Sequence, residues 1–191
     1  MWKKTTSNKK EFTSQSKQGQ APSSSQKIRP FIEAALLVAV GLVLSTFTIY
    51  RAPLGGSVTL GSTLPLCIIS LRSGARIGVL AGLNFGILSF LSSGLLIGLG
   101  PFFFDYIGAY AVLGAFGWLR KWPFLSIIMA QVGRLVCHVI SGVLFFSQGK
   151  EFQEALVYSL EYNLSFLVPD VIIGMVLFYQ LIKKSPKLLR R

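Results

Sequence analysis

IGVLAGLNFGILSFLSSGLL, residues 77–96, contains no charged residue. A helix needs roughly 20 apolar residues to cross the ~30 Å hydrocarbon core of a bilayer, so this stretch predicts a membrane-spanning helix. Five further apolar stretches lie on either side of it, at residues 30–50, 58–71, 102–119, 124–147 and 155–182. The stretch at 58–71 is shorter and must be tilted, extended through the preceding glycines or screened by its neighbours. We therefore expect an all-α membrane protein, a bundle of six transmembrane helices.

Basic residues fall on alternate connections between these stretches. Of the 19 Lys and Arg residues, 16 lie before the first stretch or after the second, fourth and sixth, whereas Arg51 and Lys150 occupy the other connections. This asymmetry follows the positive-inside rule and predicts that both termini are cytoplasmic. The net charge of +12 therefore indicates topology and contact with anionic headgroups of the lipid bilayer. No nucleic-acid partner is expected.

The ends of the chain differ in composition from its apolar centre. Residues 1–28 are rich in Ser, Lys and Gln and poor in aliphatic side chains, which predicts a disordered basic cytoplasmic tail. The long basic region, with no small-residue cleavage site after it, argues against a cleavable signal peptide. Residues 29–185 are expected to form the six-helix membrane domain, and residues 186–191 a second basic cytoplasmic tail. Cys67 and Cys137 are expected as core residues, with no disulfide and no metal site.

Small residues on shared helix faces indicate where helices pack closely, because lipid supplies no hydrophobic drive for their association. Gly78, Gly82 and Gly86 form one such stripe, which predicts packing within the bundle. Ala35 and Ala39 lie four residues apart on the first stretch. They either pack within the bundle or meet a partner.

Polar residues from three apolar stretches fall at one depth, in the half of the bundle nearest the exterior. Asp105, His138, Tyr158 and Asn163 share this level, below a glycine-rich connection at residues 51–61 that forms either a flexible loop or a lid. Singly, such residues serve as helix caps, interfacial aromatic belts or contacts between helices. Together, a carboxylate and aromatic rings with an imidazole and an amide predict a pocket for a flat cation, open to the exterior.

Three further charged residues lie within or beside the apolar stretches and need partners. Arg134 is the basic residue at a depth similar to that of Asp170, so we expect these two side chains to pair. Glu33 lies near the inner end of the first stretch. It is expected to contact headgroups or cytoplasmic basic residues.

Three short motifs follow one another, one on each of three stretches: Asp105-Tyr-x-x-Ala, His138-x-x-Ser-Gly-x-x-Phe-Phe and Tyr158-Ser-Leu-x-Tyr-Asn. With these motifs the chain resembles the thiamine-binding S-components of energy-coupling factor transporters, the ThiT/YuaJ family, from about residue 33 to residue 187. The resemblance implies a substrate-binding subunit of the bacterial cell membrane that captures thiamine from outside. It also implies delivery through a transmembrane coupling protein with two cytoplasmic ATPase subunits, and no cofactor.

The resemblance assigns roles to individual residues. Asp105 takes the position of a carboxylate that faces the thiazolium ring. Aromatic and hydrogen-bonding pocket positions correspond to Tyr106, Tyr158, His138, Asn163 and Phe146, the last being Trp in some members. Ala35 and Ala39 match the face that meets the coupling protein. Some members also carry a Trp and a Glu near residues 56–60, where this sequence has neither; Glu161 either replaces that carboxylate or faces headgroups.

Three other interpretations stay open. An S-component for another vitamin or precursor, such as hydroxymethylpyrimidine or riboflavin, would share this architecture. An intramembrane enzyme would need His138 to activate Ser141, or Asp105 to act with Asp170, but no nucleophile motif occurs and the two aspartates fall at different depths. A structural or regulatory membrane protein is the third. The sequence has no Gly-x-x-x-x-Gly-Lys phosphate loop, so a transporter of this kind must take its energy from partner ATPases.

Overall fold

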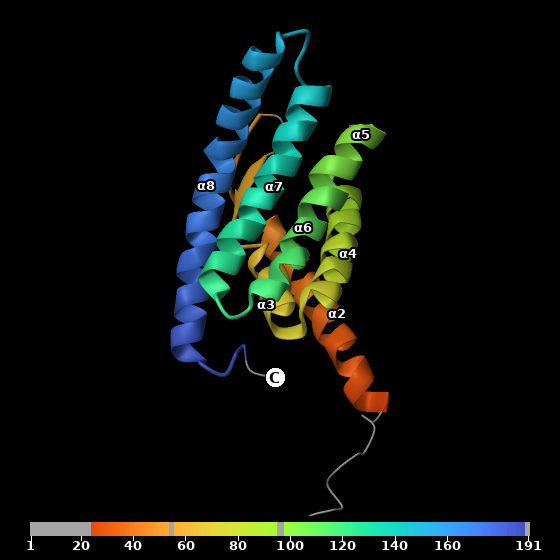
Figure 1. The fold of residues 1–191 in the computed structure, drawn as a ribbon, viewed down its shortest axis with the longest axis vertical. Coiled ribbons are helices and arrows are strands. Elements are labelled where there is room, and N and C mark those ends of the chain that lie inside the picture. The colour runs from red at the N-terminus through yellow and green to blue at the C-terminus, as the bar shows by residue number, and fades with distance from the viewer. Residues whose placement is uncertain (1–23, 54–55, 95–97, 190–191) are drawn as a thin grey trace, which may run out of the picture.

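The computed structural model describes residues 24–53, 56–94 and 98–189, and most of them are helical (Figure 1). The elements in chain order are α2 (Ser24–Thr46), β1 (Thr48–Arg51), β2 (Ser57–Thr59), α3 (Leu64–Ser73), α4 (Ala75–Ser93), α5 (Leu99–Pro101), η2 (Phe102–Gly108), α6 (Ala109–Ala115), η3 (Phe116–Leu119), α7 (Pro123–Phe145) and α8 (Phe152–Lys184). The expected tail at residues 1–28 lies largely outside the described residues. Its last part, from Ser24, belongs to α2.

Among the described residues, five helical segments are long and apolar enough to cross a membrane: Ser24–Thr46, Ala75–Ser93, Leu99–Leu119, Pro123–Phe145 and Phe152–Lys184. The short helix α3 has 10 residues and therefore spans only ~15 Å. Its residues Leu64–Leu71 are all buried, so the neighbouring helices screen it from lipid. Large apolar side chains on the other helices stay exposed, among them Leu36, Leu91 and Ile172, as expected of surfaces that face acyl chains.

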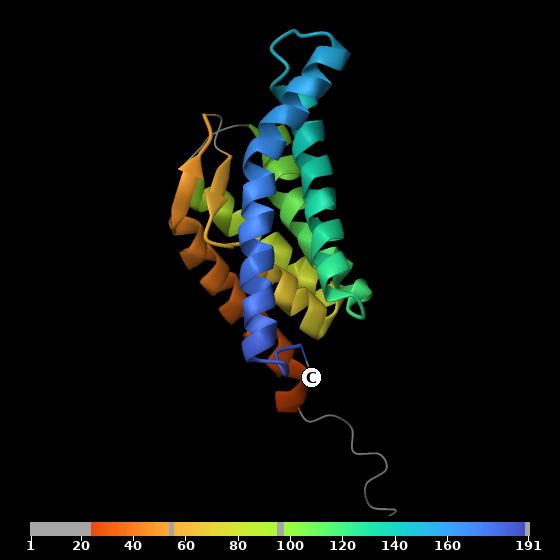
Figure 2. The same ribbon diagram turned by 90° about the vertical axis from the view of Figure 1, so that its left-hand side faces the viewer.

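The all-α expectation is wrong in one place, because two short strands follow α2. β1 and β2 pair antiparallel, with Thr48 opposite Thr59 and Arg51 opposite Ser57. The apolar stretches at residues 30–50 and 58–71 were expected to be helical through the residues that form these two strands. The strands are rich in β-branched and aromatic residues, which favour extended structure. In Figure 2 this hairpin lies beside α8.

The glycine stripe of α4 packs within the bundle, as predicted. A Cβ added at Gly78, Gly82 or Gly86 would come within 3 Å of a backbone carbonyl oxygen of the segment from η2 to α6. The two backbones therefore touch, which only glycine permits. Close by, the Ser70 hydroxyl donates a hydrogen bond of 2.6 Å to the carbonyl oxygen of Gly114, which ties α3 to the same crossing.

Both described ends of the chain lie at one end of the bundle (Figure 1). There Glu33 of α2 accepts hydrogen bonds from Arg29 Nε at 2.9 Å and from Arg72 Nη2 at 3.0 Å. The prediction that basic residues contact Glu33 is confirmed. Arg72 also donates to the carbonyl oxygen of Leu188, so the segment after α8 folds back against α3.

Candidate functional site

A rare helical form positions the carboxylate at the centre of the predicted site. Asp105 lies in η2, a seven-residue π-helix over Phe102–Gly108. A π-helix widens the backbone spiral relative to an α-helix, and such segments occur frequently at functional sites. Asp105 and its neighbour Tyr106 are both partly buried. The sequence placed Asp105 in the outer turn of a helix but carried no signal for the π form.

Two residues of α7 bind the two oxygens of this carboxylate. His138 Nδ1 lies 2.8 Å from Asp105 Oδ1, and the Ser141 hydroxyl donates to Asp105 Oδ2 at 2.7 Å. An ionised carboxylate only accepts hydrogen bonds, so His138 donates from Nδ1, and in the neutral imidazole Nε2 then carries the lone pair. His138 Nε2 is buried and has no hydrogen-bond partner among the described residues. The pair therefore presents one negative charge and one unused acceptor.

Three other predicted site residues lie on α8, in η2 and directly after α7. Asn163 is buried on α8, where its amide donates to the carbonyl oxygen of Ser159 at 2.8 Å. Tyr106 packs edge-on against the ring of Phe90 on α4, with ring centroids 5.3 Å apart. Phe146, partly buried, is the residue that follows α7.

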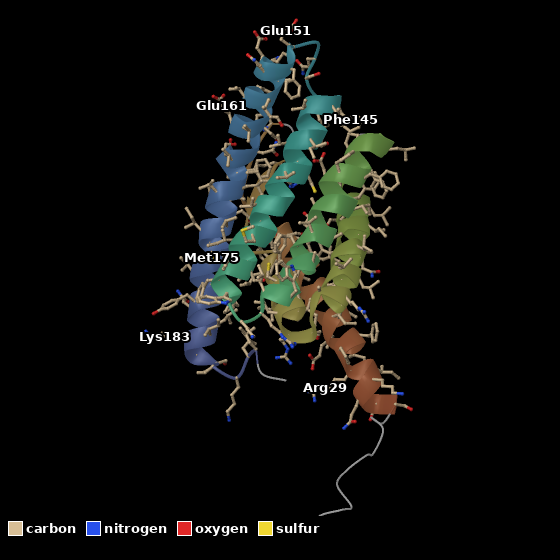
Figure 3. The ribbon with its side chains drawn as sticks, in the orientation of Figure 1. Arg29, Phe145, Glu151, Glu161, Met175 and Lys183 are labelled. Carbon is tan, nitrogen blue, oxygen red and sulfur yellow. The ribbon has the colours of Figure 1, made fainter. Side chains whose placement is uncertain are left out.

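Tyr158 and Glu161 lie near one another on α8, closer to its first residue than Asn163 is. Both line a cavity of about 460 Å³, with Lys150, Gln153, Glu154 and Val157. The ammonium of Lys150 lies 5.1 Å from the centroid of the Tyr158 ring, a cation–π geometry. Figure 3 shows Glu161 in the same half of the molecule as Phe145 and Glu151, away from Arg29 and Lys183 at the opposite end.

The hairpin contacts this half of the site through two aromatic residues of α8. The backbone amide of Gly56 donates to the Tyr162 hydroxyl at 3.0 Å, and a Cβ at Gly56 would collide with the ring of Phe166. Phe166 in turn meets the His138 ring at a centroid distance of 6.2 Å. The connection at residues 51–61, expected to be either a flexible loop or a lid, thus contains the second strand of a hairpin that contacts α8. Phe166 was not among the predicted site residues.

One helical turn deeper, the hairpin is anchored by a buried ion pair. Asp170 accepts hydrogen bonds from the amide and hydroxyl of Thr59, at 2.9 and 2.8 Å, and from Arg134 Nη1 at 3.4 Å. Arg134 also stacks on the ring of Tyr110. The predicted pairing of Arg134 with Asp170 is confirmed, and Thr59 is a partner that the sequence did not reveal.

This anchor makes a testable contribution to stability. Thr59→Val keeps the shape of the side chain but removes its hydroxyl, so one lone pair of the buried Asp170 carboxylate loses its donor. We expect the free energy of unfolding to fall by about 1–3 kcal/mol, measured by thermal melting of the purified protein in detergent. The control is Thr48→Val, because Thr48 is the cross-strand partner of Thr59 and makes only a 3.4 Å hydrogen bond to a carbonyl oxygen. Equal melting temperatures for the two variants would contradict an anchor at Asp170.

The alanine pair of α2 lies apart from these polar groups. Ala35 and Ala39 are exposed, whereas the adjacent Ala34 and Val38 are buried in the core. The two exposed alanines line a groove of about 310 Å³ between α2 and α4, together with Phe31, Ala34, Val38, Leu42, Ile77, Leu80, Ala81, Asn84 and Leu88. The described bundle therefore leaves this face uncovered.

No cluster of three or more His, Cys, Asp and Glu side chains suited to a metal ion occurs in the described part of the chain. Cys67 and Cys137 are both free. The polar side chains of the predicted site that the described structure joins directly are the Asp105 carboxylate and the His138 imidazole, with Ser141 on the second carboxylate oxygen and the Phe166 ring beside the imidazole.

Comparison with known proteins gives consistent matches over nearly the whole described chain. The family model described as thiamine transporter protein (Thia_YuaJ) matches residues 31–190. The thiamine transporter ThiT of Bacillus subtilis (strain 168) is 28% identical over 187 residues, which cover 87% of this chain and 96% of that protein. The solved structure of ThiT from Listeria monocytogenes matches with a TM-score of 0.74 at 25% identity, over 85% of this chain and 98% of the other.

Proposed function

Because the chain belongs to the thiamine transporter protein family (Thia_YuaJ), we propose that it is the substrate-binding membrane subunit of an energy-coupling factor importer. It captures thiamine outside the bacterial cell and delivers it through a transmembrane coupling protein driven by two cytoplasmic ATPase subunits. The observation that carries this proposal is the partly buried Asp105 carboxylate, held on both oxygens by His138 and Ser141 of α7.

The chemistry of thiamine suits this arrangement. Its thiazolium ring is a flat cation, and its aminopyrimidine ring carries hydrogen-bond donors and acceptors. The Asp105 carboxylate offsets the positive charge, and His138 Nε2 accepts a hydrogen bond from the ligand. Tyr106, Tyr158 and Phe146 supply aromatic faces for stacking and cation–π contact, and the Asn163 amide adds polar contacts. Glu161, exposed beside Tyr158, adds negative charge where the cation enters.

The proposed topology has six membrane crossings and two cytoplasmic termini. Five long apolar segments supply five crossings, and the segment from β2 through the screened helix α3 supplies the sixth. An even number of crossings agrees with the position of both described ends at one end of the bundle (Figure 2). The basic residues of the alternate connections favour the cytoplasm for that end. The Asp105 site then opens toward the exterior, as capture from outside requires.

We assign the exposed face of α2 that carries Ala35 and Ala39 as the docking surface for the coupling protein. Small residues allow a partner helix to approach closely, and within a bilayer packing replaces the hydrophobic drive. The groove beside Ala35 and Ala39 also contains Asn84, a polar side chain in a membrane-facing position that favours coverage by protein. The docking face and the ligand groups therefore lie on different helices.

The geometry disfavours the intramembrane enzyme. A serine nucleophile needs a hydrogen bond to its general base, but the Ser141 hydroxyl donates to Asp105. Asp105 and Asp170 are held in separate clusters with different partners, so they do not form a carboxylate pair. We therefore treat the protein as a non-enzymatic transport subunit. A subunit for riboflavin or hydroxymethylpyrimidine lacks the same support, because neither ligand carries the quaternary cation that Asp105 fits.

Ligand identity is tested by thermal melting with added vitamins. Thiamine at about one hundred times its dissociation constant stabilises a binding protein by about 2.7 kcal/mol, which corresponds to a rise of roughly 5–10 °C for a chain of this size. A thiamine analogue with a neutral ring in place of the thiazolium should bind far more weakly, because it leaves the Asp105 charge uncompensated. A rise with riboflavin or biotin and none with thiamine would refute the ligand assignment.

A further inference from the structure

We propose that Ser141 is a positioning residue of the thiamine site, which holds Asp105 so that His138 keeps its acceptor nitrogen toward the ligand. This inference rests on the proposed function. Neither the sequence motif nor the resemblance gave Ser141 a role in binding. The structure assigns one through its contact with the carboxylate.

The contact is short, partly buried and built into the crossing of two segments. Ser141 is 1% exposed, and its hydroxyl lies 2.7 Å from Asp105 Oδ2. It follows His138 by three residues on α7, so the two side chains lie on one face of the helix. From that face they reach the two oxygens of a single carboxylate in η2. The π-helix and α7 are thereby joined at the level of the site.

A carboxylate held by one oxygen turns easily, because the terminal torsion of an Asp side chain is broad. With Oδ2 fixed by Ser141, Oδ1 stays in line with His138 Nδ1. The Nδ1–H of His138 then has one acceptor, and its Nε2 has a lone pair and no proton. Because serine is neutral, it fixes the carboxylate without cancelling the negative charge that attracts the thiazolium ring.

The fixed tautomer has a consequence for ligand selection. An unprotonated Nε2 accepts a hydrogen bond from an amino group. A carbonyl oxygen in the same place has no proton to donate, so the two lone pairs repel each other. Oxythiamine differs from thiamine by an oxo group in place of the amino group on the pyrimidine ring, with the same thiazolium cation. The inferred tautomer therefore favours thiamine over oxythiamine, since a site built to pair with a donor rejects a ligand that lacks it.

The test compares Ser141→Ala with the wild-type protein by titration calorimetry with both ligands. We expect the affinity for thiamine to fall about tenfold, with a much smaller change for oxythiamine, so the preference between them shrinks. Ser141→Thr keeps a hydroxyl and should restore part of the preference. The matched control is Ser126→Ala. Ser126 is a buried serine of the same helix that donates to the Phe116 carbonyl oxygen, also at 2.7 Å.

The outcomes separate this inference from the function on which it rests. Failure of the wild-type protein to bind thiamine would overturn the proposed function itself. If the wild type binds thiamine and Ser141→Ala keeps the same affinity and preference, Ser141 does not position the site. Equal losses for thiamine and oxythiamine, with a lower melting temperature than Ser126→Ala, would show a purely structural role and would also overturn the inference.

Discussion

Asp105→Asn is expected to weaken thiamine binding by about a hundredfold or more. The substitution keeps the size of the side chain and removes its charge, so the thiazolium cation enters a partly buried site with no counter-charge. Loss of one member of a desolvated ion pair costs several kcal/mol, because the other charge stays uncompensated. In the unsubstituted protein, His138 and Ser141 bind the two oxygens of the Asp105 carboxylate. Asn replaces one of these oxygens with an N–H₂ group, which cannot accept the hydrogen bond. Titration calorimetry with thiamine measures the loss directly.

Asp170→Asn is the matched control, because it makes the same chemical change elsewhere in the membrane domain. Asp170 is paired with Arg134 and Thr59, so its loss leaves Arg134 buried without a counter-charge. We expect a clear fall in melting temperature and a smaller effect on thiamine affinity in the folded protein. Small and equal effects of both substitutions on affinity would remove Asp105 from the binding site.

Features of the bundle that depend on local composition were predictable from the sequence. Apolar length located the long helices, because the thickness of the bilayer fixes the number of residues needed. The glycine spacing on α4 predicted close packing within the bundle, since spacing by four residues defines one helix face. Depth along the helices predicted the Arg134–Asp170 pair, because a buried charge needs a partner at its own level.

Features that depend on distant parts of the chain were not predictable in this way. Thr48 pairs with Thr59 across the hairpin. Thr59 also binds Asp170, which lies 111 residues further along the chain. The sequence at 58–71 is mostly apolar, and such a run does not distinguish a strand from a buried helix. Composition carries no mark of the π-helix at Asp105. The role of Ser141 depends on which oxygen its hydroxyl reaches.

Capture and delivery occupy different surfaces of the fold, and this separation leads to the second large effect. Ala39→Leu is expected to abolish thiamine uptake by cells while leaving thiamine binding by the purified protein intact. Ala39 is exposed on α2 beside the groove lined by Leu80 and Asn84, and a leucine there holds a partner helix away. Ala35→Leu should act in the same way. Uptake assays, thiamine titration and co-purification with the coupling protein measure the three quantities separately.

Gly41→Leu distinguishes loss of docking from loss of folding. Gly41 is buried on α2, away from the groove residues, and a Cβ there would come within 2.9 Å of the Phe85 ring and of the Ser62 carbonyl oxygen. A leucine at this position overpacks the core, which costs typically about 1–3 kcal/mol, so melting temperature and binding should fall together. If Ala39→Leu behaved like Gly41→Leu, with co-purification falling only as folded protein is lost, α2 would pack only within its own bundle. Retained binding with lost co-purification instead identifies α2 as the face that meets the coupling protein, because a ligand site built from η2, α7 and α8 does not require it.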